Sequence, residues 1–71
     1  MKLRELRKRQ FKTLADVATA AEVSVALISL IERGLRYPAP KTLKRLAEKG
    51  YQIDVNTFDL LFEKAKDDGK Q

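Results

Sequence analysis

Apolar residues recur along this chain at intervals of three and four, the spacing that places side chains on one face of an α-helix. No segment shows a convincing alternation of apolar and polar residues, which is typical of a half-buried strand. The pattern predicts one all-α domain over residues 1–66, followed by a polar tail over residues 67–71. Five helices are expected, over residues 2–10, 14–20, 25–33, 40–49 and 57–66.

The second and third of these helices have the clearest boundary signals. Thr13 and Asp16 fit a capping box, in which Asp replaces the usual Glu or Gln. Ser24 is the expected N-cap of the third helix, and Gly34 is its expected C-terminal stop. Only about three residues separate the two helices, so together they predict a helix-turn-helix.

The last two helices are delimited by proline, glycine and asparagine. Pro40 is expected in the first turn of the fourth helix, and Gly50 is expected to end it. Asn56 is the expected cap of the fifth helix, with Asp59 three residues later. The inner stripe of this helix is Phe58, Leu61, Phe62 and Ala65.

The third helix, within the sequence SVALISLIERG at residues 24–34, has apolar residues on nearly every side. Since successive helical residues are about 100° apart, Ile28 and Ile31 are predicted to face the core and Leu27 to be half covered. The residues predicted to face outward are Ala26, Ser29, Leu30 and Arg33, with Val25 on their flank.

Composition argues against several classes of function. The chain of 71 residues has no cysteine and no histidine, and its three glycines lie too far apart to cradle a phosphate. We therefore expect no enzyme, no catalytic residue, no metal site, no cofactor and no small-molecule ligand. The longest apolar run is far shorter than the roughly 20 residues of a membrane span, so we expect a cytoplasmic protein without membrane attachment.

The charge is unevenly distributed along the chain. The net charge is +5, and residues 1–45 carry 11 Lys and Arg against 4 Asp and Glu, whereas residues 46–71 carry 4 against 6. Six of these basic residues crowd positions 2–12. Such a cluster is typical of proteins that bind polyanions, although a solvated helix face has the same appearance.

The segments TLADVA, VSVALISLIERG, YP and LKRLAEKGYQIDV occur in an order that resembles the Xre-like helix-turn-helix family of phage repressors and Cro-type proteins. The resemblance covers residues 2 to about 64. It implies a compact five-helix phage-repressor-like domain in a prokaryotic host cell. It also implies a structural ion pair between Arg7 and Glu32. Glu22 stands where the family commonly has glycine, so either this residue is left-handed or the turn takes another shape.

The resemblance places the outward side of the third helix in the major groove of double-stranded DNA. Family members commonly carry hydrogen-bonding side chains there, whereas Val25, Ala26 and Leu30 have none. Leu14 stands where many relatives have a phosphate-contacting glutamine. Three interpretations stay open: neighbouring helices cover this surface, it presses on thymine methyl groups, or it binds a protein. In the second interpretation the phosphate contacts are Arg9, Lys12, Arg33, Arg36 and Lys41.

We favour a protein interface formed by Leu14, Val25, Ala26, Ser29 and Leu30 with a basic rim. The hypothesis is a modulator of a phage-type genetic switch, an antirepressor that masks another helix-turn-helix repressor while binding DNA at least non-specifically. The alternatives are a Cro-like homodimer on an operator, with Leu60 and Phe62 as its dimer surface, and an antitoxin that regulates its own operon.

Overall fold

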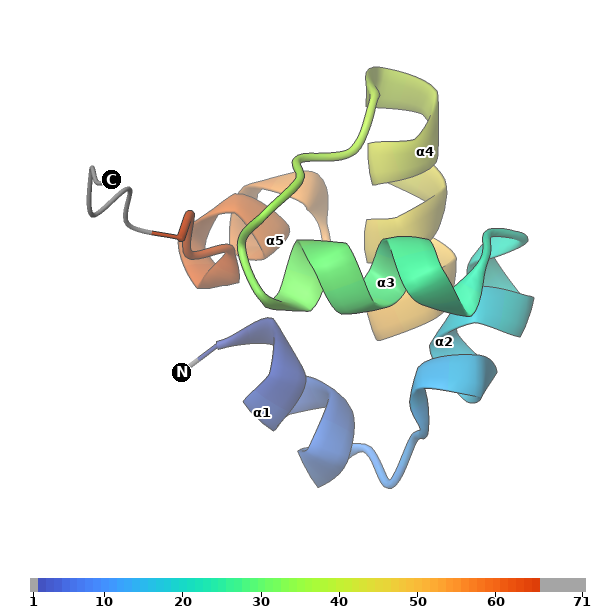
Figure 1. The fold of residues 1–71 in the computed structure, drawn as a ribbon. Helices are drawn as coiled ribbons and strands as arrows, with labels where there is room; N and C mark the ends of the chain where they lie inside the picture. The colour runs from blue at the N-terminus through green and yellow to red at the C-terminus, as the bar shows by residue number, and fades with distance from the viewer. Residues whose placement is uncertain (1, 66–71) are drawn as a thin grey trace.

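The computed structural model describes residues 2–65, and this part of the chain is all-helical, which confirms the predicted fold class (Figure 1). The predicted tail at residues 67–71 lies outside the described residues. In chain order the elements are α1 (Leu3–Arg9), α2 (Leu14–Ala21), α3 (Val25–Glu32), α4 (Pro40–Arg45), the π-helical segment η1 (Leu46–Tyr51) and α5 (Val55–Leu61).

The predicted caps of α2 and α3 are confirmed. Thr13 Oγ1 accepts a hydrogen bond from Asp16 N at 3.0 Å, and Asp16 Oδ2 accepts one from Thr13 N at 2.8 Å. These two bonds hold the pKa of Asp16 below its ordinary value. Ser24 Oγ accepts a hydrogen bond from Leu27 N at 3.1 Å. Both helices therefore begin where the sequence places them.

α2 and α3 form the expected helix-turn-helix. Their axes are bent by 112° at the turn between them, within the range of this motif. Within residues 2–65 no single helix is long and apolar enough to cross a membrane, although this bent pair reaches that length and composition when the two helices are counted together.

The predicted cap and length of α5 are wrong. Asp54 caps the helix by accepting a hydrogen bond from Thr57 N at 2.6 Å, whereas Asn56 lies within the helix. α5 ends at Leu61 because Phe62 is extended and Ala65 N donates to Gly34 O at 2.8 Å. The backbone of residues 63–65 thus packs on the end of α3 and does not continue α5.

Gly50 does not end the fourth helix, contrary to the prediction. The chain continues from α4 into η1 and passes through Gly50 to Tyr51 before Gln52 becomes left-handed. Gly50 is buried, and a Cβ atom there would lie 3.0 Å from Val17 Cγ1. The absence of a side chain at Gly50 therefore allows η1 to pack closely against α2. The spacing of residues in the sequence gives no signal for this contact.

Three helices end in the same type of turn. In each turn a backbone N–H donates to the carbonyl oxygen five positions earlier. These bonds run from Lys12 N to Arg7 O, from Val23 N to Ala18 O and from Leu35 N to Leu30 O. Each such turn needs a left-handed residue, which costs roughly 1 to 2 kcal/mol unless that residue is glycine. The residues at these positions are Phe11, Glu22 and Gly34, with φ of 58°, 60° and 75°. The turn at Glu22 thus keeps the left-handed shape.

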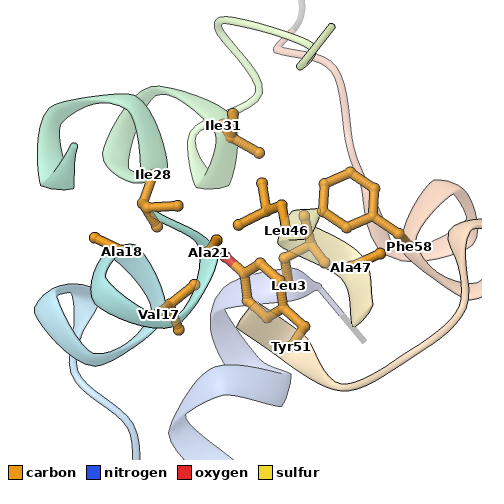
Figure 2. Close-up of a cluster of buried hydrophobic side chains, with 10 residues drawn as sticks. All are labelled: Leu3, Val17, Ala18, Ala21, Ile28, Ile31, Leu46, Ala47, Tyr51 and Phe58. Carbon is orange, nitrogen blue, oxygen red and sulfur yellow. The ribbon is translucent and has the colours of Figure 1, made fainter. Parts of the chain in front are cut away.

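The core gathers side chains from every helix except α4 (Figure 2). Ile28 and Ile31 point into it from α3, and Tyr51 and Phe58 are its largest members. The core consists of Leu3, Val17, Ala18, Ala21, Ile28, Ile31, Leu46, Ala47, Tyr51 and Phe58.

An aromatic cluster extends this core toward the loop after α3. The ring of Tyr37 meets that of Phe62 edge-on at 5.1 Å and that of Phe58 at 6.5 Å between centroids. The Tyr37 hydroxyl donates to Asp59, which raises the pKa of Tyr37 to about 12. Asp59 is therefore a partner of this loop and does not complete a capping box with Asn56.

Candidate nucleic-acid interface

α3 lies across one side of the domain, with α1 on one flank and α4 on the other (Figure 1). Its inner residues Ile28 and Ile31 are buried as expected, and Leu27 is half-buried against the core. Helix α3 thus has one face fixed by packing and one face turned outward. The outward face is the candidate interface.

The outward face is less exposed than the sequence predicts. Ala26 and Arg33 are exposed and Val25 is 44% exposed, but Ser29 and Leu30 are half-buried. Leu30 loses exposure because the turn at Gly34 brings residue 35 back over it. Leu14 of α2, expected on the same surface, is half-buried against the core.

A groove of about 410 Å³ opens where α1, α2 and α3 meet. Leu14 and Ser29 line its walls, and the groups around it are predominantly basic. Its lining residues are Lys2, Arg4, Arg7, Leu14, Ser29, Glu32 and Arg33. The groove therefore joins the outward side of α3 to the basic side of α1.

The ion pair that the resemblance implied, between Arg7 and Glu32, joins α1 to α3 at this groove. Arg7 Nε donates to Glu32 Oε2 at 2.7 Å and Nη2 donates to Oε1 at 3.1 Å, and the side chains are only 8% and 5% exposed. The hydrogen bonds to Glu32 raise the pKa of Arg7. Tyr51 Oη also donates to Glu32 Oε2 at 2.7 Å, so the carboxylate connects α1, α3 and η1.

All three nitrogens of the Arg7 guanidinium donate hydrogen bonds inside the domain. Its Nη1 donates to Lys12 O at 2.9 Å, which ties α1 to the start of α2. Arg7 is therefore a structural residue that fixes the orientation of α3 relative to α1, as the family resemblance implied.

Lys12 has a different role from the predicted phosphate contact. Its Nζ donates to Gly50 O at 2.9 Å and to Gln52 Oε1 at 3.1 Å. The side chain is half-buried because it caps the carbonyl end of η1. The contact joins residues 38 positions apart, and local pattern gives no signal for it.

The other four predicted phosphate contacts are exposed: Arg9, Arg33, Arg36 and Lys41. Arg9 lies on α1, whereas Arg36 and Lys41 lie in the loop after α3 and the first turn of α4. The elements that carry Arg9 and Lys41, α1 and α4, lie on the two sides of α3 (Figure 1). A helix that enters a DNA groove needs cations on both flanks, because phosphates line both edges of the groove.

Sequence reasoning counted Arg4 in the basic cluster at positions 2–12 but did not name it as a contact residue, and it missed Phe11. Arg4 is exposed, lines the groove and lies one helical turn before Arg7, a spacing that would have placed it on the same side of α1. Phe11 is 95% exposed at the α1–α2 corner. The sequence carries little signal for that exposure, since an aromatic residue between two helices more often joins the core.

Comparisons with known proteins agree with this geometry. A profile of the family described as a helix-turn-helix domain matches residues 1–61. The HTH-type transcriptional regulator DdrOP3 of Deinococcus deserti is 45% identical over 60 residues, which are 84% of this chain and 44% of that relative. The chain thus spans less than half the length of this relative. From the profile match and the α2–α3 geometry, the chain belongs to the Xre-like helix-turn-helix family.

Proposed function

We propose that this protein is a transcriptional regulator that binds double-stranded DNA with α3 in the major groove. The observation that carries the proposal is the exposed side of α3 between two basic flanks, held in place by the buried Arg7–Glu32 pair. Membership of the helix-turn-helix family and the name of the DdrOP3 relative support the same function.

Phosphate contacts supply most of the binding free energy in this proposal. The exposed cations of α1, of the end of α3 and of the segment that follows it to the start of α4 are Arg4, Arg9, Arg33, Arg36 and Lys41. Neutralising five phosphates gives a slope of about −4.5 in a plot of log K against log salt. Affinity then falls several hundredfold between about 50 and 200 mM salt.

Base recognition by α3 is weak in this proposal. Val25 and Ala26 offer no side-chain hydrogen bond, and the half-buried Ser29 is the one hydrogen-bonding side chain on the outward side of α3 before Arg33. Methyl and methylene groups contact the C5-methyl of thymine but do not form the bidentate bonds that contribute about 1 to 3 kcal/mol each. We therefore propose that the affinity for DNA is largely independent of sequence and that thymine is preferred at only a few positions.

A pair of charge changes at Ala26 tests the position of α3 on DNA. Ala26→Glu is expected to weaken duplex binding by about tenfold or more, because the carboxylate meets phosphates, whereas Ala26→Arg strengthens it. Both variants keep the fold, since Ala26 is exposed. Fluorescence anisotropy of a labelled duplex, titrated over the same salt range, measures the effect.

Asn56→Glu is the matched control, because Asn56 is exposed on α5 and the substitution adds the same charge. It is expected to weaken binding much less than Ala26→Glu, through net charge alone. Equal losses in the two variants would show that α3 does not contact the DNA.

A second candidate function is docking on another helix-turn-helix repressor in a phage-type genetic switch, with the DNA-binding surface of that partner masked. The observation that favours it is the exposed apolar area at the two ends of α3, where Val25 is 44% and Leu35 is 57% exposed. Exposed apolar residues bordered by exposed cations have the composition of a protein interface. In this case both Ala26→Glu and Ala26→Arg disrupt the complex, whereas on DNA they act in opposite directions.

A further inference from the structure

Phe11 combines two unfavourable features at the corner between α1 and α2. Its side chain is 95% exposed, and its backbone is left-handed with φ of 58°. The turn is required by the fold, because Phe11 N donates to Lys8 O at 3.0 Å and Lys12 N donates to Arg7 O at 3.2 Å. Glycine satisfies such a turn without strain, and the exposed ring adds almost no packing. The fold therefore explains the turn but not the phenylalanine.

The corner that carries Phe11 is firmly attached to the domain. On one side, Gln10 Nε2 donates to Tyr51 O at 2.8 Å. On the other side, Lys12 Nζ donates to Gly50 O at 2.9 Å. Both neighbours of Phe11 thus anchor to the end of η1, and the ring is presented from a fixed backbone. A side chain held in this way loses little entropy on binding a partner.

The corner adjoins the candidate nucleic-acid interface. Arg4 and Lys8 are exposed one turn apart on α1, and Arg4 lines the groove beside α3. Leu14, three residues after Phe11, lines the same groove from α2. Three residues span at most about 10 Å, so Phe11 lies within that distance of the groove wall. Exposed cations of α1 and the exposed ring thus lie on adjoining segments between the groove and the corner.

We infer that Phe11 extends the DNA contact beyond α3, with its ring against a deoxyribose of the backbone and Lys8 on the adjoining phosphate. The inference rests on the proposed function. Sugar C–H groups are the apolar part of the DNA backbone, and each is flanked by phosphates. The DNA backbone therefore alternates between apolar sugars and charged phosphates. An exposed aromatic ring near exposed cations matches this alternation, and in the same complex the exposed side of α3 contacts the groove.

Phe11→Gly tests the inference, because it removes the ring and relieves the backbone. We expect the variant to gain roughly 5 °C in Tm while its affinity for duplex DNA falls about tenfold. The slope of log K against log salt stays unchanged, since phenylalanine neutralises no phosphate. Hydroxyl-radical footprinting, which reports on exposed sugar hydrogens, is carried out on a duplex enriched from a randomised pool, so that the bound position is fixed, and is expected to lose protection at one edge of the site.

Two further variants separate the ring from the backbone. Phe11→Tyr keeps the ring and is expected to keep both affinity and footprint. Glu22→Gly relieves another exposed left-handed residue, with φ of 60°, away from the Phe11 corner, and is expected to gain Tm without loss of affinity.

Other results would overturn either the inference about Phe11 or the proposed DNA-binding function. Equal affinity and an identical footprint for Phe11→Gly and the unchanged protein overturn the inference, and they leave a protein partner as the occupant of the ring. A change in salt slope also overturns it, because the ring would then act through phosphate contacts. Failure of the unchanged protein to bind any duplex overturns the proposed function itself.

Discussion

Replacing Arg7 with methionine is expected to destabilise the domain by about 3 to 5 kcal/mol. The substitution leaves the Glu32 carboxylate only 5% exposed without its cation, and it removes the donor to Lys12 O. A domain of this length has little stability to lose, so the variant is expected to be largely unfolded near physiological temperature. Urea denaturation followed by circular dichroism measures the loss.

A triple variant controls for the loss of packing. Combining Arg7→Met with Glu32→Leu and Tyr51→Phe removes the cation, the carboxylate and the hydroxyl that donates to it. Because buried ion pairs can be replaced by apolar groups at small net cost, this variant is expected to regain most of the lost stability. A loss below about 1 kcal/mol for Arg7→Met alone would contradict a buried, structural role for the pair.

Gly34→Ala is expected to be the next most damaging change, with a loss of about 2 to 4 kcal/mol. A Cβ atom at this position would lie 2.0 Å from Glu63 O and 2.5 Å from Ala65 N, both backbone atoms. The residue also has φ of 75°, which alanine adopts only with strain. The segment after α5 must therefore leave the end of α3, and urea denaturation detects the loss.

Gly50→Ala is the matched control for Gly34→Ala. Its Cβ atom would lie 3.0 Å from Val17 Cγ1 and 3.1 Å from Leu46 Cδ1, which are side-chain atoms that are able to shift. A smaller loss of about 1 kcal/mol is expected. If Gly34→Ala and Gly50→Ala lowered the free energy of unfolding by the same amount, the close packing of residues 63–65 on Gly34 would be contradicted.

The elements that depend on local signals were predictable from the sequence. The caps at Thr13 and Ser24 act within three residues, and the stop at Gly34 acts within one turn. The start of α5 was mispredicted because Asp54 and Asn56 are both favourable N-cap residues, and the structure shows that Asp54 accepts the capping bond from Thr57 N. The end of α5 depends on the bond from Ala65 to Gly34, which links positions far apart in sequence.

The candidate site was predictable where it depends on helical periodicity. The inner side of α3 follows from the 100° rotation per residue, and so does the exposure of Ala26 and Arg33. The half-burial of Leu30 depends on the returning chain, and the capping of η1 by Lys12 depends on a distant carbonyl. Neither contact leaves a periodic signal.

The most direct test of the DNA-binding proposal is selection of duplexes from a randomised pool by the purified protein at physiological salt, followed by sequencing. The account predicts that duplexes are retained with a weak enrichment of thymine at fixed positions. That enrichment is expected to disappear with Ala26→Glu while the Asn56→Glu control keeps it. A pool without enrichment, or with the same enrichment for Ala26→Glu, would contradict the placement of α3 in the major groove.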